Sequence, residues 1–186
     1  MYDNGYSSDL FEIIEVISDI CTVLDIEEPG LCIDDGVQFH TSTTMAMIDS
    51  PDRILYLNPE YFSLTIKFMP LHIFALGHEL RHLFQYKHGE TFENYKPNNK
   101  TSLEEYNMQQ VEIDANAFGL ICVLNWYGED CFWDFLSSLQ SNESMEKVLD
   151  IAFDHMESIM ENEPELMERL LSVFDEEDDE EAEEYV

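Results

Sequence analysis

One segment of this 186-residue chain constrains its fold more than any other, the apolar run that begins at Pro70 and ends at Gly89. Its apolar side chains recur at helical intervals, while proline suits the first turn of a helix and glycine its end. In the middle of this predicted helix, residues 78–82 read His-Glu-Leu-Arg-His. Burying ionisable side chains costs free energy unless they are paired or bind an ion, so these side chains need a chemical reason to lie there.

The spacing of these side chains is typical of a zinc site. A helix turns by about 100° per residue, so His78 and His82 project from one face about one turn apart and can share one metal ion. Glu79 lies beside the metal, where a carboxylate can take a proton from zinc-bound water that attacks a carbonyl group. The pattern therefore predicts Zn2+ as cofactor, His78 and His82 as ligands and Glu79 as the catalytic base.

A catalytic zinc ion needs a third protein ligand. One candidate is His88, because the three histidines have the spacing of a zinc pattern in which a glycine lets the chain turn sharply after the second. Here Gln85 replaces that glycine and favours continuation of the helix to Gly89. In a continuous helix His88 would lie about 15 Å along the axis from His78, too far to share an ion. His88 is therefore the less favoured ligand.

Two further candidates lie on a second long helix, which a capping box predicts from residue 101 to about residue 128. Glu112 and Asn116 share one face of this helix, so the carboxylate can bind zinc while the amide orients a ligand. Asp114 faces about 200° away from Glu112 and would bind the metal only if the helix were rotated. This geometry favours Glu112 as the third ligand, with Asn116 in the second shell and Asp114 as the weaker alternative.

The two segments together resemble a known family. His-Glu-Leu-Arg-His, followed by Glu-Ile-Asp-Ala-Asn-Ala-Phe at 112–118, is similar to the gluzincin metallopeptidases, and most of all to the small ImmA/IrrE-type proteases. The resemblance extends over residues 53–125. It implies a zinc-dependent metalloendopeptidase in which His78, His82 and Glu112 bind zinc. Glu79 would be the base, and the Asn116 amide would support a ligand. It also implies a protein substrate, because these proteases cut DNA-binding repressors.

The remaining segments predict an α+β fold that is mainly helical, with a small N-terminal sheet and the HExxH helix packed against the second long helix. Helical apolar spacing over residues 10–24 indicates a first helix. Short β-prone runs between turn signals indicate strands at residues 31–33, 37–40, 44–48 and 53–57. The last of these is expected to be the edge strand on which an extended substrate pairs. Further helices are expected at residues 59–69, 130–140, 143–160 and 164–174.

The chain is expected to hold one domain. Residues 1–174 are expected to form it, since the length of the chain and its 45% hydrophobic content suffice for a single core. The resemblance implies that this domain is a zincin-like metallopeptidase. Residues 175–186 read DEEDDEEAEEYV and predict an acidic, disordered tail. By position alone, the side chains that could stabilise an oxyanion near the motif are His72, Arg81, Tyr86 and Tyr106.

The chain is strongly acidic, with 41 Asp and Glu against 8 Lys and Arg and a formal net charge of −33. Direct binding to nucleic acid or to an anionic membrane through a basic face is therefore not expected. The charge favours basic partners, DNA-binding proteins among them, as the protein or peptide substrate. It also supports a second hypothesis, a non-enzymatic acidic protein that binds a basic partner or mimics nucleic acid on a metallopeptidase-like scaffold.

The cysteines and the first apolar run bear on the compartment. The four cysteines form no Cys-x-x-Cys pair and lie mostly in apolar runs, which is typical of reduced core cysteines. The first apolar run is interrupted by Glu12, Glu15 and Asp19, which argues against a signal peptide or a membrane span. We therefore expect a cytoplasmic protein, and the sequence leaves its oligomeric state open.

Overall fold

The computed structural model describes residues 8–33, 39, 44–62, 69–90, 95–97, 100–139 and 143–183. This part is mainly helical with one small mixed sheet, which confirms the α+β prediction. The strands are β1 (Gly30–Ile33), β2 (Ala46–Asp49) and β3 (Ile54–Leu57). The helices are α1 (Ser8–Leu24), α2 (Pro70–Lys87), α3 (Leu103–Asn107), α4 (Gln110–Leu139), α5 (Glu143–Asn162) and α6 (Pro164–Glu183).

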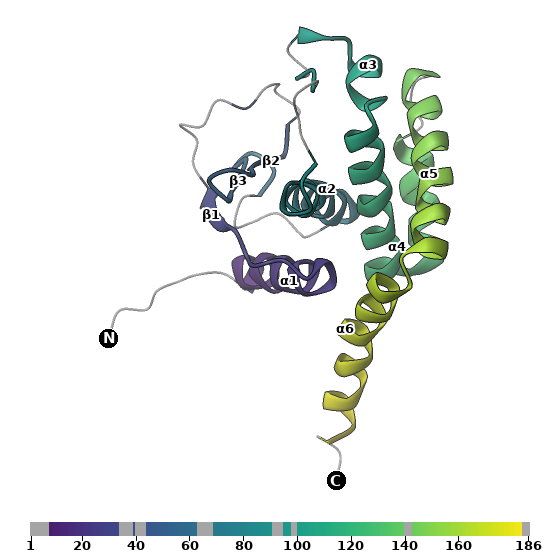
Figure 1. The fold of residues 1–186 in the computed structure, drawn as a ribbon. Coiled ribbons are helices and arrows are strands. Elements are labelled where there is room, and N and C mark those ends of the chain that lie inside the picture. Colours follow the sequence, from purple (N-terminus) through teal and green to yellow (C-terminus); the bar gives the residue numbers. More distant parts are fainter. Residues whose placement is uncertain are drawn as a thin grey trace.

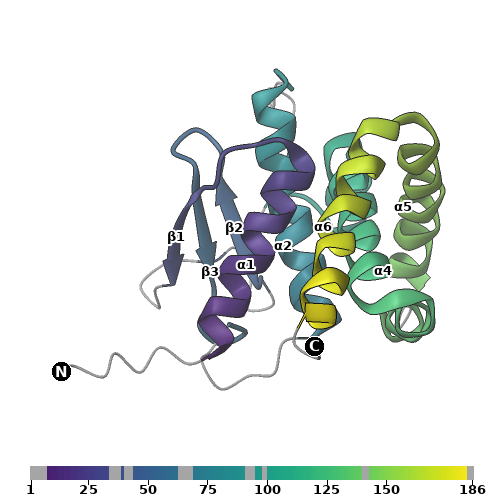
Figure 2. The same ribbon diagram turned by 90° about the horizontal axis from the view of Figure 1, so that it is seen from below.

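Helix α2 lies at the centre of this arrangement. The sheet and the α4–α5 pair lie on opposite sides of it, in both Figure 1 and Figure 2. Helix α1 lies beside α2 and α6 and packs against both (Figure 2). Among the described helices, none combines the length and the apolar character that crossing a membrane would need.

The sheet has the strand order β1-β3-β2, so β3 is its central strand. It pairs parallel with β1, where Leu55 lies opposite Leu31, and antiparallel with β2, where Tyr56 lies opposite Met47. The expectation that residues 53–57 form an edge strand is therefore wrong. The alternate residues Leu55 and Leu57 of β3 are fully buried, as expected for a central strand whose backbone groups are paired on both sides. The strand beside α2 is β2.

Local signals predicted α1 and α2 well. Helix α2 begins at Pro70 and ends at Lys87, before Gly89 with a positive φ of 84°. The second long helix is interrupted, because Ser102 caps only the short α3 and α4 begins at Gln110. Gly128, the predicted end of that helix, has a φ of 74° and kinks α4, which continues to Leu139.

Three predictions concern segments that the structure describes only in part. Of the predicted helix at residues 59–69, residues 59–62 form turns and residues 63–68 lie outside the described part of the chain. The predicted strand at residues 37–40 also lies outside it, apart from Phe39. Helix α6 runs to Glu183 and so extends into the segment expected to be a disordered tail. Glutamate and alanine favour helix, but no side chain after Val173 is described, so the division at residue 174 stays a prediction.

Two glycines let α2 and α4 approach closely. A Cβ atom on Gly77 would lie 2.8 Å from Cys122 Sγ and 3.2 Å from the Cα atom of Gly119. A Cβ atom on Gly119 would lie 2.8 Å from the carbonyl oxygen of Phe74. Any side chain at either position would force the helices apart. The crossing lies one residue before His78, so it sets the distance between the HExxH motif and α4.

Replacing Gly119 with alanine is therefore expected to destabilise the fold by about 1–2 kcal/mol, because overpacking against backbone costs more than the roughly 1 kcal/mol that alanine gains in a helix. Urea unfolding measures this as a lower midpoint at unchanged slope. Gly30→Ala is the matched control, since its Cβ would meet nothing closer than 3.7 Å. Equal stability of Gly119→Ala and wild type would contradict the close crossing.

Candidate metal centre

Three predicted ligands from α2 and α4 converge at this crossing. The Nε2 atoms of His78 and His82 lie 3.1 Å apart, and they lie 3.3 Å and 3.4 Å from the two carboxylate oxygens of Glu112. Ligand atoms that lie about 2.0–2.2 Å from a tetrahedral zinc ion are separated by about 3.3–3.6 Å. The three side chains are thus spaced as zinc ligands are, and they are the one such cluster of potential metal ligands found among the described residues.

The outer nitrogens of both histidines face oxygen atoms. His78 Nδ1 lies 3.0 Å from Asn116 Oδ1, and His82 Nδ1 lies 2.8 Å from Gln85 Oε1. An amide oxygen can only accept a hydrogen bond, so each Nδ1 donates one. In a neutral imidazole the other nitrogen then carries a lone pair. When both rings are neutral, as metal binding requires, both Nε2 atoms therefore present lone pairs to the centre of the cluster.

Glu112 adds a third acceptor to the same space. Its side chain is fully buried, and Oε1 accepts a hydrogen bond of 2.8 Å from the Tyr95 hydroxyl group. Oε2 has no hydrogen-bond partner among the described residues. A buried carboxylate oxygen without a hydrogen-bond partner is costly, and only positive charge beside it, a proton on a histidine or a bound metal ion, offsets that cost. A cation is what this set of atoms lacks, and the donor set fits zinc.

The close approach of the carboxylate and the two imidazoles also shifts the pKa values of the cluster. Burial raises the pKa of Glu112, but His78 and His82 outweigh it and hold the pKa well below its usual range. Burial lowers the pKa of His82, but Glu112 and Glu79 outweigh it and raise the pKa to about 9. The site thus attracts positive charge. A metal ion would compete there with a proton, so its affinity is expected to fall as the pH falls.

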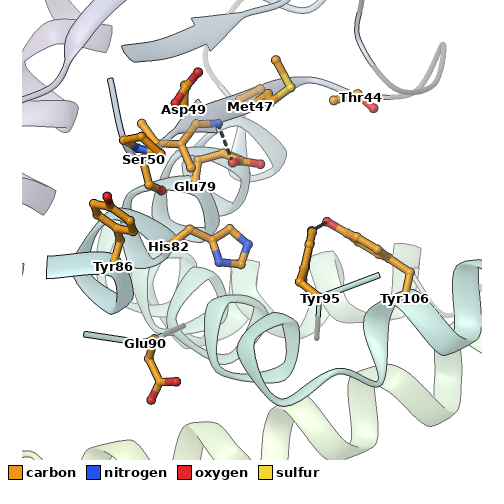
Figure 3. Close-up of a pocket in the computed structure, with 13 residues that line it drawn as sticks. Thr44, Met47, Asp49, Ser50, Glu79, His82, Tyr86, Glu90, Tyr95 and Tyr106 are labelled. Atoms are coloured by element: carbon orange, nitrogen blue, oxygen red, sulfur yellow. Dashed lines mark hydrogen bonds between the residues drawn. The ribbon is translucent and has the colours of Figure 1, made fainter. Parts of the chain in front are cut away.

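Glu79 lies beside the cluster and is held by the sheet. Its Oε2 accepts a hydrogen bond of 2.9 Å from the backbone N–H of Ile48 in β2, drawn as a dashed line in Figure 3. No described residue is hydrogen-bonded to Oε1. Burial raises the pKa of Glu79, and its carboxylate is not among the three converging ligand groups. This is the position expected of a base beside a metal ion rather than of a ligand.

Two pockets reach the cluster. The larger, of about 570 Å3, opens onto Glu79 and His82 between β2 and three tyrosines, Tyr86, Tyr95 and Tyr106 (Figure 3). The smaller, of about 450 Å3, opens onto His78 and Asn116. Glu79 and Tyr106 line both pockets. A small molecule or peptide could therefore reach both sides of the Glu79 carboxylate.

The two weaker ligand candidates lie outside the cluster. Asp114 Oδ2 and Oδ1 accept hydrogen bonds of 2.8 Å and 3.0 Å from Arg81, so this carboxylate faces the guanidinium group rather than the histidines. Burial raises the pKa of Asp114, but Arg81 outweighs it and lowers the pKa. His88 is exposed, and its Nδ1 donates to the carbonyl oxygen of Phe84. Helix α2 continues past Gln85, as predicted, and carries His88 away.

The side chains considered for oxyanion stabilisation separate into two groups. Tyr86 and Tyr106 line the larger pocket. Arg81 is bound to Asp114 and Glu163, and His72 lies between the backbone of Tyr61 and Met69, so both have structural partners.

Sequence reasoning missed two residues of this centre. Gln85 was considered only as a replacement for glycine, yet its place one helical turn after His82 could have suggested a contact. Tyr95 lies in a segment without predicted structure, and no sequence signal places its hydroxyl group against Glu112.

Comparison of the chain with known protein families, with curated proteins and with solved structures finds no match. The likeness to the gluzincin metallopeptidases therefore rests on two short segments, residues 78–82 and 112–118.

Proposed function

We propose that this chain is a zinc-dependent metalloendopeptidase, in which α2 and α4 together hold the metal. The observation that carries the proposal is the convergence of two histidine Nε2 atoms on a buried carboxylate, one oxygen of which has no hydrogen-bond partner in the part of the chain that the structure describes. Two histidines and one glutamate form a ligand set of catalytic zinc, which keeps a fourth position open. The resemblance of residues 78–82 and 112–118 to the ImmA/IrrE-type proteases supports the same assignment.

The residues around the cluster suit peptide hydrolysis. Zinc bound there would act as a Lewis acid that polarises a peptide carbonyl group and lowers the pKa of water. Glu79 takes the proton of the attacking water at Oε1, because Ile48 occupies Oε2, and then delivers it to the leaving amine. Burial raises the pKa of Glu79, which makes its carboxylate a stronger base than that of an exposed glutamate.

Strand β2 offers the substrate a place to bind. The Asn58 N–H donates a hydrogen bond to the Met45 carbonyl oxygen. In an antiparallel ladder, Met45 and every second residue after it then direct their backbone N–H and C=O groups toward β3. The backbone groups of Ala46 and the carbonyl group of Ile48 then lie on the outer edge of β2, beside Glu79, which already binds the Ile48 N–H. An extended peptide can add to this edge by backbone hydrogen bonds, which places its carbonyl groups over the cluster.

The charge distribution favours basic substrates. Asp49 and Glu90 line the larger pocket, whose described lining contains no lysine or arginine, and the chain as a whole carries a formal net charge of −33. Complementary charge speeds association and selects partners. We propose a cytoplasmic enzyme that cleaves basic protein segments, such as those of DNA-binding proteins.

A peptidase assay with three sets of unstructured peptides of equal length, basic, neutral and acidic, tests this function. Basic peptides are expected to be cleaved with the highest kcat/KM, and the preference to weaken at high salt as charges are screened. A chelator is expected to abolish cleavage, and added zinc to restore it. Cleavage that survives metal removal would contradict the proposal, and a preference for acidic peptides would contradict the assigned substrate class.

The second candidate is a non-enzymatic acidic protein that binds a basic partner or mimics nucleic acid. The observation that favours it is the net charge of −33, which this scaffold carries with only eight basic residues. It does not account for a carboxylate beside three converging metal-ligand side chains. Binding of a basic partner without cleavage, by protein with zinc fully bound, would favour this candidate.

A further inference from the structure

We propose that Gln85 is a positioning residue of the metal centre, which holds His82 in the tautomer that turns a lone pair toward the metal. The inference rests on the proposed zinc site and concerns how the chain prepares one of its ligands. Gln85 is buried, and it lies one helical turn after His82 on α2.

The orientation of the Gln85 amide group is determined by its nitrogen. Nε2 donates hydrogen bonds of 2.9 Å to the carbonyl oxygen of Val111 and 2.8 Å to Asp114 Oδ2. An amide nitrogen carries two hydrogens, so both are used. Oε1 is therefore the atom that faces His82 Nδ1 at 2.8 Å. Turning the amide over would break both bonds and place a donor against the imidazole.

The amide oxygen dictates where the His82 proton lies. Because Oε1 cannot donate, the hydrogen between the two atoms belongs to His82 Nδ1. The neutral ring then has its lone pair at Nε2, the atom that lies 3.1 Å from His78 Nε2 and 3.4 Å from Glu112 Oε1. An imidazole that already has the right tautomer and orientation needs no rearrangement when it binds metal, so the affinity for metal is higher.

Gln85 is itself held by a partly buried network that reaches from α2 to other helices. Asp114 of α4 accepts from Arg81 and from Gln85, and its Oδ1 lies 3.2 Å from Nε2 of His155 on α5. Arg81 also donates to Glu163, which lies between α5 and α6. The network ties the ligand helix to α4 and to the α5–α6 connection. Arg81, the arginine within the HExxH motif, therefore supports Gln85 through Asp114 and does not contact the metal ligands.

The substitution Gln85→Met tests the proposal, because methionine keeps the length of the side chain but neither accepts from His82 nor donates to Asp114. Loss of an outer partner of a metal ligand costs about 10–100-fold in affinity, so the zinc Kd is expected to rise by that factor. Competition with a chromophoric chelator measures the Kd.

The matched control is Glu163→Gln, which weakens the same network at Arg81 but does not contact His82. It is expected to lower Tm and to leave the zinc Kd within about threefold of wild type. If Gln85 acts only as a structural residue, both variants will lower Tm and neither will change the Kd, and that result overturns the inference.

NMR of the imidazole nitrogens in zinc-loaded wild-type protein tests the same point without substitution. The expected result is a hydrogen-bonded proton on His82 Nδ1 and metal at Nε2. Metal at Nδ1 overturns the inference even if Gln85→Met does not fold. Wild-type protein that binds no zinc overturns the proposed function as well, whereas zinc binding with the wrong tautomer overturns this inference alone.

Discussion

Replacing Glu79 with glutamine is expected to lower kcat for peptide hydrolysis by about 10²- to 10⁴-fold while zinc stays bound. Glutamine has the shape of glutamate and keeps an oxygen for the Ile48 N–H, so the contact between α2 and β2 survives. It cannot take a proton from water at neutral pH. Since Glu79 is not one of the three converging ligand groups, the affinity for zinc should change little.

The measurement is kcat together with zinc content, on Glu79→Gln and on a control in which another glutamate is changed. Glu129→Gln serves as that control, because Glu129 is exposed on α4 and lines neither pocket at the cluster. Wild-type turnover by zinc-loaded Glu79→Gln would show that another group is the base. Loss of both zinc and turnover would show that Glu79 holds the metal.

The second large effect is expected at Glu112, the proposed ligand on α4. Replacing Glu112 with alanine should weaken zinc binding by more than the roughly 100-fold that loss of an outer partner costs, because a direct ligand and the buried negative charge disappear together. The empty space left in the core will also lower stability, so circular dichroism has to confirm the fold before the zinc Kd is compared.

His88→Ala is the matched control for this experiment. His88 is the alternative third ligand that the spacing of the histidines allows, and in the structure it is exposed and bonded to the end of α2. The zinc Kd of His88→Ala is expected to equal that of wild type. Unchanged zinc binding in Glu112→Ala with loss in His88→Ala would mean that the end of α2 turns back toward the metal.

The residues of the centre could be predicted where their relation is local. The two histidines and the glutamate of HExxH lie on one helix, whose boundaries follow from proline and glycine, and helical geometry then relates their side chains. The place of Glu112 beside the two histidines was predictable because it shares a helix face with Asn116, four residues on. That prediction required only that the two helices pack together, and Gly77 and Gly119 bring them together.

Relations that depend on the whole fold were not predictable. The strand order is decided by which strands pair across long loops, so the edge beside Glu79 proved to be β2 and not β3. The contacts of Gln85 depend on how α4 packs against α2, and the contact of Tyr95 joins a segment outside any helix or strand to α4. The break between α3 and α4 was missed because Ser102 is a good helix cap whether the helix that follows has one turn or five.

The most direct test of the zinc site is the metal content of the purified protein. Wild-type protein, dialysed to remove loosely bound ions and analysed by mass spectrometry of the elements, is expected to carry about one zinc ion per chain, and Glu112→Ala almost none. Folded wild-type protein that contains no zinc, and that takes up none when zinc is added, would contradict the account.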